Sequence, residues 1–203
     1  MKIVLLVEGA TEKVFIPYLR RFLETKVKNM PKLLVRKYDG RIPTHDKLKR
    51  IVENNLSGKD AADYVIALTD VYTGSNPPDF TDAADAKQKM KAWVGNEPRF
   101  SPHAAQYDFE AWLLPYWEII QKIARHKMAC PGSNPETVNH QNPPSHRIKE
   151  IFSKGKFRSY VKPRDAGRIL DETKDNLLKA INSCSELKAL VNTILRLCGE
   201  ETI

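Results

Sequence analysis

Acidic residues that follow apolar stretches are the part of this sequence best suited to chemistry. Several converging carboxylates repel one another unless a cation neutralises them. Hard cations such as Mg²⁺ prefer oxygen ligands, and one or two such ions can activate water and stabilise the leaving oxygen in phosphodiester cleavage. If the fold brings them together, these acids predict a metal site. They are Glu8, Glu12, Asp70, Asp108 and Glu110.

The elements that must position these acids form an α/β fold. Apolar runs rich in β-branched residues are typical of strands buried on both faces, and helical periodicity separates them. We expect a mainly parallel, Rossmann-like sheet with helices on both faces, whose ligands bind at the carboxyl ends of the strands. The acids follow three of these ends, with Glu12 one helical turn beyond Glu8. The predicted strands are residues 2–7, 33–38, 64–69 and 103–107.

Local signals predict the helices. Thr11 is expected to cap the first helix, which Pro17 should kink or displace. Pro115 should divide a helix predicted over 108–124. A capping box at 183–186 should begin the last helix.

One domain with a helical addition is the expected organisation. Residues 129–145 are rich in Pro and Asn and predict a long loop. The α/β domain is therefore placed at 1–128, and a helical C-terminal extension that packs on it at 129–203.

Each acid also has an ordinary structural explanation. Glu12 lies in the first turn of a helix, where acids are favourable. Asp70 could cap a loop, Asp108 could be an N-cap, and Glu110 could be a first-turn acid. Glu8 is harder to explain in this way, because it ends a fully apolar strand directly before a glycine. The prediction of a metal site rests on the convergence of all of them.

The charge is unevenly distributed along the chain. Residues 13–59 hold 13 Lys and Arg against 4 Asp and Glu, and residues 145–168 hold 8 against 2. Residues 60–118, between them, hold 4 against 10. An acidic middle between basic flanks suits a metal site beside a surface that binds a polyanion, although solvated helix faces would have the same composition.

The segment 153–160 mixes cations with aromatic residues around a glycine. Lys154, Lys156 and Arg158 are the residues that we expect to bind a nucleic-acid backbone. Lys156 is also assigned a catalytic role, in which it stabilises the charge of the transition state. A solvated basic loop is the alternative.

Other classes of protein are disfavoured. Three cysteines, without CxxC spacing, argue against a disulfide framework and a structural zinc site, so a reducing cytoplasm is expected. The sequence contains no apolar run of about 18 residues, so a membrane span is not expected. The histidines lack metal-ligand spacing, and neither a GxSxG elbow nor a GxxxxGK[ST] loop is present.

Four segments, taken in order, resemble a known family. VEGATE at 7–12 resembles the first motif of the TOPRIM superfamily, and LTDVY at 68–72 resembles the second. Small stand-alone TOPRIM-like proteins of uncharacterised function show a closer resemblance, over about residues 3–170. It rests on the segments VEGATEKVF, ALTDVYTGSNPPDF, QYDFEAWLL and PPSHRIKEIFSKGKF.

The resemblance implies roles for the acids. Glu8 would serve catalysis and bind metal, Glu12 would be a second metal-binding glutamate, and Asp70 would be the catalytic first acid of a DxD motif. Asp108 or Glu110 would complete the metal site. Tyr72 stands where the second DxD acid is usual, and a phenol is a poor Mg²⁺ ligand because its pKa is about 10. Either the later acids substitute, or one ion binds, or the protein is not a nuclease.

Two functions are therefore carried forward. The first is a Mg²⁺- or Mn²⁺-dependent nuclease acting on DNA or RNA. The resemblance implies that it works in defence against phage or foreign DNA, with an SMC- or ABC-like ATPase as partner protein. The second is a non-catalytic adaptor or sensor subunit that binds an ATPase or nucleic acid. Assembly into a homo-oligomer is left open.

Overall fold

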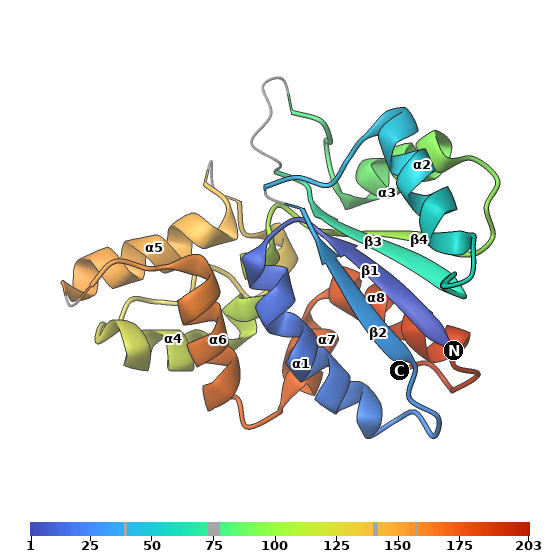
Figure 1. Ribbon diagram of the computed structural model, residues 1–203. Helices are drawn as coiled ribbons and strands as arrows, with labels where there is room; N and C mark the ends of the chain where they lie inside the picture. Colours follow the sequence, from blue (N-terminus) through green and yellow to red (C-terminus); the bar gives the residue numbers. More distant parts are fainter. Residues whose placement is uncertain (39, 73–77, 140–141, 157) are drawn as a thin grey trace.

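A four-stranded parallel sheet forms the centre of the molecule (Figure 1). The computed structural model describes residues 1–38, 40–72, 78–139, 142–156 and 158–203. In spatial order the strands are β2, β1, β3 and β4, and each neighbouring pair is parallel. The predicted α/β fold class is confirmed. The strands are β1 (Lys2–Val7), β2 (Lys32–Lys37), β3 (Tyr64–Asp70) and β4 (Phe100–Ala105).

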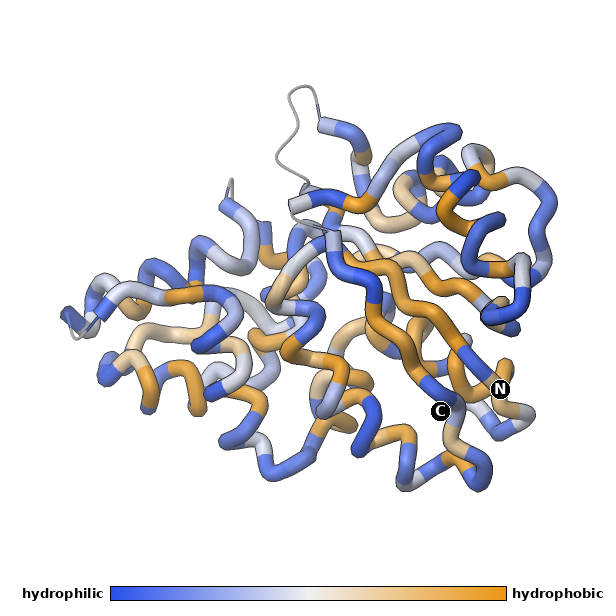
Figure 2. The backbone as a smooth tube through the Cα atoms, in the orientation of Figure 1, coloured by the Kyte–Doolittle hydropathy of each residue, from blue (hydrophilic) through white to orange (hydrophobic). Residues whose placement is uncertain are grey.

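The two central strands carry the most apolar sequences. Residues 3–7 of β1 and 65–69 of β3 are all buried, as expected for strands covered on both faces. At the edge, β2 exposes Lys32, Arg36 and Lys37, and exposed charges of this kind discourage pairing with another chain. Figure 2 shows hydrophobic residues along the strands and hydrophilic ones at strand ends and outer turns.

Helices cover both faces of the sheet, as predicted. Val4 and Leu6 of β1 pack with α2 and α3, whereas Leu5 and Val7 pack with α1, η1, α7 and α8. Across the described ranges, no helix is both long and apolar enough to cross a membrane. The helices are α1 (Ala10–Glu24), α2 (His45–Leu56), α3 (Ala83–Val94), the 3-10 helix η1 (Phe109–Tyr116), α4 (Trp117–Ala124), the 3-10 turn η2 (Pro135–Thr137), α5 (Pro144–Gly155), α6 (Lys162–Glu172), α7 (Leu177–Ser183) and α8 (Ser185–Leu197).

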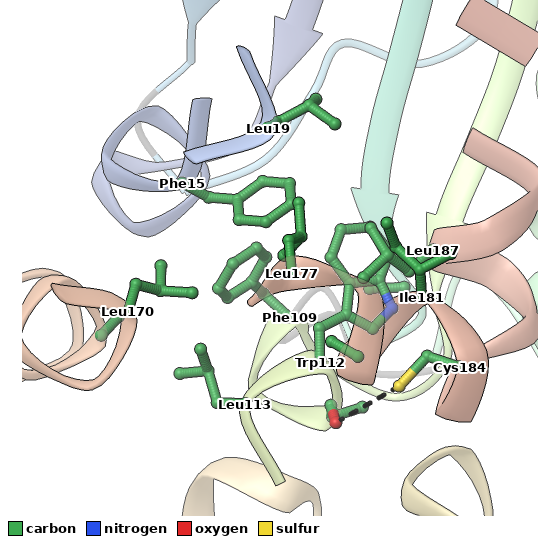
Figure 3. Close-up of a cluster of buried hydrophobic side chains, with 14 of the residues drawn as sticks. Phe15, Leu19, Phe109, Trp112, Leu113, Leu170, Leu177, Ile181, Cys184 and Leu187 are labelled. Carbon is green, nitrogen blue, oxygen red and sulfur yellow. Dashed lines mark hydrogen bonds between the residues drawn. The ribbon is translucent and has the colours of Figure 1, made fainter. Parts of the chain in front are cut away.

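The C-terminal helices share one hydrophobic core with the sheet. At its centre, the rings of Phe15, Phe109 and Trp112 pack against each other with centroids 5.4 to 5.8 Å apart. Ile181 of α7 and Leu187 of α8 lie beside Trp112 (Figure 3). The segment after residue 128 therefore contributes to the same core as β1 and α1.

The start of α1 differs from the prediction. Gly9, and not Thr11, occupies the N-cap position, and the Glu12 side chain accepts a hydrogen bond from the Gly9 N–H at 3.1 Å. The helix then continues through Pro17, which is exposed. The Thr11 prediction was wrong because the strand ends at Val7 and leaves Gly9 as the last non-helical residue.

One strand boundary is shifted, because β4 begins at Phe100 rather than 103. The helix predicted over 108–124 is divided near Pro115, as expected: Pro115 lies in the last turn of η1, and α4 follows from Trp117. The loop expected after Asp70 lies in part at 73–77, outside the described residues.

The capping box predicted for the last helix is wrong. Ser183 ends α7 instead, and its hydroxyl donates to the Lys179 carbonyl oxygen at 2.8 Å. The first turn of α8 is capped by the buried Glu136 carboxylate, which accepts from the Glu186 N–H at 3.0 Å and from the Ser185 hydroxyl at 2.6 Å. A carboxylate suits the positive end of a helix dipole, so a distant residue performs the function expected of a local one.

Candidate functional site

The five predicted acids meet at the carboxyl edge of the sheet. Glu8 directly follows β1, Asp70 is the last residue of β3, and Asp108 is the N-cap of η1 beyond β4. Glu12 and Glu110 stand in the first turns of α1 and η1. Four of the five are almost fully buried, and Asp70 is partly exposed. We call this group the acidic centre.

The five carboxylates affect one another through their charges. The pKa of Asp70 is raised well above its usual value, first by desolvation and then by the charges of the other four acids. Charges of like sign raise one another's pKa values when they lie near each other. The strand-end argument placed Glu8 and Asp70 at the same edge, where the Asp70 N–H donates to Glu8.

Glu8 is held by the end of β3. Its Oε1 accepts hydrogen bonds from the Thr69 hydroxyl and from the Asp70 N–H, the latter at 3.2 Å. Burial, with a smaller contribution from the charge of Glu12, raises the pKa of Glu8 to about 7, although both hydrogen bonds lower it. Its carboxyl is thus oriented by two donors, while the protein around it disfavours the charged form.

Glu12 is fixed by the turn that precedes its helix. Besides the hydrogen bond to its Oε2, a Cβ added at Gly9 would lie 3.2 Å from that same oxygen. A residue larger than glycine would therefore press on this carboxylate. Burial raises the pKa of Glu12, and the charge of Glu110 adds to the shift.

A lysine that the sequence reasoning missed neutralises part of the acidic centre. Lys162 Nζ lies 3.0 Å from Glu110 Oε2 and 4.0 Å from Asp108 Oδ2. Burial lowers the pKa of Lys162, but the charges of Glu110, Asp108 and Asp70 outweigh burial and hold it above its usual value. Lys162 is the first residue of α6, where the helix dipole disfavours a cation. A lysine at this unfavourable position was the signal in the sequence that could have indicated a nearby group of acids.

Asp108 and Glu110 have further protein donors. The Ser145 N–H donates to both oxygens of Asp108, at 3.2 and 3.3 Å, and the Tyr160 hydroxyl donates to Glu110 Oε1 at 3.2 Å. Burial nevertheless raises both carboxyl pKa values, that of Glu110 to about 7. The start of α5 and the segment before α6 therefore complete the site from the C-terminal part of the chain.

Carboxyl groups outnumber the basic groups that act on the acidic centre. Among the residues that the structure describes, Lys162 pairs with Glu110 and Asp108, and Arg41 acts on Glu8 through its charge. Such a centre can take up protons or a hard cation, and its all-oxygen donor set fits Mg²⁺ or Mn²⁺. Among the described side chains, however, no three His, Cys, Asp or Glu are arranged to hold a metal ion as they stand. Metal binding would require some carboxylates to turn from their present partners.

Tyr72, at the unusual DxD position, makes contacts outside the acidic centre. Its phenol oxygen accepts a hydrogen bond from Asn139 Nδ2 at 2.8 Å, and its ring lies 5.4 Å from the ring of Tyr107. The side chain is 39% exposed. Tyr72 is therefore hydrogen-bonded to Asn139, shortly after η2.

The predicted basic residues lie apart from the acids. Lys154 pairs with Glu150 at 2.6 Å, Arg158 pairs with the buried Asp165 at 2.7 Å, and Lys156 is exposed at the end of α5. The ion pairs with the acidic centre come from Lys162 instead. The roles assigned to Lys154, Lys156 and Arg158 stay predictions.

Fold and site together define an α/β protein with a buried acidic centre at the carboxyl edge of a parallel sheet. The family model described as "Domain of unknown function (DUF4276)" matches residues 7–195, so the chain belongs to that family. Curated proteins give no match.

Two solved structures are similar to this chain. The C-terminal region of the Burkholderia pseudomallei OLD protein has a TM-score of 0.54 at 11% identity, and the match covers 97% of this chain and 98% of that one. The C-terminal region of the Xanthomonas campestris pv. campestris OLD protein has a TM-score of 0.43 at 11% identity, with 97% and 96% covered. At this identity the Burkholderia structure supports the fold alone. That likeness fits the TOPRIM resemblance noted in the sequence.

Proposed function

We propose that this protein is a metal-dependent nuclease that hydrolyses phosphodiester bonds with Mg²⁺ or Mn²⁺. The observation that carries the proposal is the acidic centre, which gathers five carboxyl groups at the strand ends, two of them paired with Lys162. Burying several acids close together is costly, and a divalent ion would lower that cost. The likeness to an OLD protein region and the TOPRIM-like motifs support the same activity.

The metal ligands would come from Glu8, Glu12, Asp70, Asp108 and Glu110. A bound ion would supply an activated water and stabilise the leaving oxygen. Thr69 and the Asp70 N–H orient Glu8, and Tyr160 orients Glu110. Lys162 stays protonated and gives the site a positive group suited to a phosphate oxygen, the role first assigned to Lys156.

Cleavage assays on the purified protein test this proposal. Plasmid, linear DNA and RNA are incubated with Mn²⁺, with Mg²⁺ and with EDTA, using wild type, Glu8→Gln and Asp70→Asn. We expect metal-dependent cleavage that each substitution lowers at least about 100-fold, because each removes a ligand or catalytic acid.

Glu53→Gln provides the control, because Glu53 is an exposed acid on α2, away from the acidic centre. It should cleave like wild type. Cleavage that persists in Glu8→Gln and Asp70→Asn would show that the active site lies elsewhere.

A non-catalytic adaptor or sensor is the second candidate, and Tyr72 favours it. With a tyrosine in place of the second DxD acid, and that tyrosine bound to Asn139, the acidic centre could be a relic. Calorimetric titration with Mn²⁺ separates the two: a relic should bind weakly and equally in wild type and Asp70→Asn. The ATPase partner and the role in defence remain predictions from the resemblance.

A further inference from the structure

A hollow of about 490 Å³ lies between α5 and the segment that leads to α6. Phe152 forms part of its floor, packed against the Tyr160 ring with centroids 5.3 Å apart. We call this hollow the α5 basic pocket. The other side chains that line it are Lys149, Lys156, Arg158, Ser153, Ser159 and Tyr160.

The cations of the α5 basic pocket are poorly neutralised. Lys149 and Lys156 make no ion pair with any described residue, and both are exposed. Arg158 pairs through Nη1 with Asp165, which leaves its Nε and Nη2 buried without hydrogen-bond partners. Ser153 and Ser159 add exposed hydroxyl groups. Lysines, an arginine and hydroxyls are the groups that bind backbone phosphates.

The backbone holds Lys156 in place at the end of α5. Lys156 adopts a left-handed conformation with φ of 52° as the C-cap residue. Before it, Gly155 packs so tightly that an added Cβ would lie 1.8 Å from the Ala124 carbonyl oxygen. The position of this lysine is therefore set by contact between α4 and α5.

Tyr160 joins the α5 basic pocket to the acidic centre. Its ring lines the pocket, while its hydroxyl donates to Glu110. From Arg158 to Lys162 the chain spans at most about 13 Å. Each strand of a duplex rises about 3.4 Å per nucleotide, so this distance corresponds to a few nucleotides.

The basic surface continues beyond the α5 basic pocket. Arg158 also borders a second hollow of about 420 Å³, whose lining includes Arg125, Arg164 and Arg168. Glu172 is the acid in that lining, and Lys122 pairs with it at 2.8 Å. Cations therefore extend from Lys162 at the acidic centre, past Tyr160, to the outer surface of α4 and α6.

We propose that the α5 basic pocket binds a backbone phosphate of the nucleic-acid strand that is cleaved, a few nucleotides from the bond that lies at the acidic centre. This inference rests on the proposed nuclease function and names the subsite that holds the substrate. Lys149 and Lys156 contribute charge, and Ser153 and Ser159 contribute hydrogen bonds. The α5 basic pocket sets affinity and its dependence on salt, and the acidic centre carries the chemistry.

Binding without metal tests the subsite separately from cleavage. Fluorescence anisotropy of short labelled DNA and RNA oligonucleotides is measured in EDTA over a range of KCl concentrations, with wild type and the double variant Lys149→Ala/Lys156→Ala. We expect about 10-fold weaker binding at low salt and a slope of log K against log salt that is smaller by about 1 to 2. Both lysines are exposed, so the variant should keep its fold, which its melting temperature checks.

A matched control comes from another helix. Lys179 carries the same charge and is exposed on α7, outside the α5 basic pocket. Lys179→Ala should change affinity less than about 2-fold. Equal losses in the control and the double variant would overturn the subsite.

Competition identifies the source of the phosphate. Inorganic phosphate and a mononucleotide should displace the labelled strand only at far higher concentration than an unlabelled oligonucleotide. If the mononucleotide competes as well as the oligonucleotide, the α5 basic pocket binds a free nucleotide and the proposal is wrong. If wild type cleaves and the double variant binds the oligonucleotide as tightly as wild type, the subsite is rejected and the nuclease function stands. Loss of binding in a protein that never cleaves would instead reject the nuclease alone.

Discussion

The acidic centre and the α5 basic pocket hold their charges in opposite ways. The acids are buried at strand ends and helix starts, and backbone or hydroxyl donors orient most of them. The pocket lysines are exposed side chains, Lys149 in the middle of α5 and Lys156 at its end, with no ion pair among the residues described. Buried, oriented charge suits chemistry, because water does not screen it, whereas exposed charge suits reversible binding of a polyanion.

Removal of Lys162 should give the largest effect in this comparison. Lys162→Ala should lower the cleavage rate on the order of 1000-fold, because a cation aimed at developing charge is lost. Lys162→Arg should recover part of that rate. Single-turnover kinetics with saturating substrate measure the chemical step directly. Lys156→Ala, measured beside it, should weaken substrate binding and leave that step unchanged. Equal effects of both variants on the chemical step would remove the distinction between the regions.

The pH dependence of stability should reveal the acidic centre without substrate. Burial raises the pKa of Glu8 from 4.5 to about 7, so the folded state holds a proton that the unfolded state releases. The stability from this group is complete below about pH 4.5 and is lost as pH rises through about 7. For Glu8 alone the loss is on the order of 3 kcal/mol, and Glu110, also raised to about 7, acts in the same direction.

Chemical denaturation of the metal-free protein between about pH 5 and about pH 8 measures this loss. Glu8→Gln should flatten the profile. Mn²⁺ should restore stability at the upper end. His103 acts with the opposite sign, because burial lowers its pKa from 6.5 to about 4, so a His103→Asn variant should show a steeper fall. A free energy of unfolding that rises from about pH 5 to about pH 8 in wild type and in His103→Asn would contradict this explanation.

The contact beneath the α5 basic pocket predicts a smaller effect. Gly155→Ala would bring a methyl group to 1.8 Å from the Ala124 carbonyl oxygen, so α5 must move from α4. We expect a loss of about 2 kcal/mol in the free energy of unfolding, as for other overpacked sites. Urea titration measures it, with Lys154→Ala as a control on the same helix. Nucleic-acid binding should weaken as well, because Lys156 shifts with the helix end. No change in stability would mean that α4 and α5 are not in tight contact.

Loss of the link between the two regions should give the smallest effect. Tyr160→Phe keeps the ring in the α5 basic pocket and removes the hydroxyl that donates to Glu110. We expect the activation free energy of cleavage to rise by about 1 kcal/mol, the contribution of a single hydrogen bond, while the affinity measured in EDTA stays constant. A change in binding with unchanged cleavage would show that Tyr160 belongs to the basic region alone.

The sequence predicts well whatever depends on local pattern. Apolar runs located β1 and β3, and the rule that parallel strands end at one edge brought Glu8 and Asp70 together in advance. Pro115 divided its helix for a reason carried by the residue itself. Periodicity and residue type are enough in such cases because the deciding interactions lie within a few residues.

Contacts between residues far apart in the sequence were not predicted. Lys162 lies 52 residues from Glu110, and Glu136 caps a helix that starts 49 residues later. Apart from the unfavourable position of Lys162 at the start of a helix, no local pattern distinguishes these residues from other lysines and glutamates. Both contacts depend on tertiary packing, which brings α6 against α1 and η2 against α8.

The core shared by the sheet and the C-terminal helices has a consequence for cooperativity. Because Phe15, Trp112 and Leu187 belong to one cluster, opening α8 exposes the side chains that support α1 and its acid. Elements that share a core exchange their amide hydrogens through the same opening event. An ion bound at the acidic centre should therefore slow hydrogen exchange in α8, although α8 itself contributes none of the five acids.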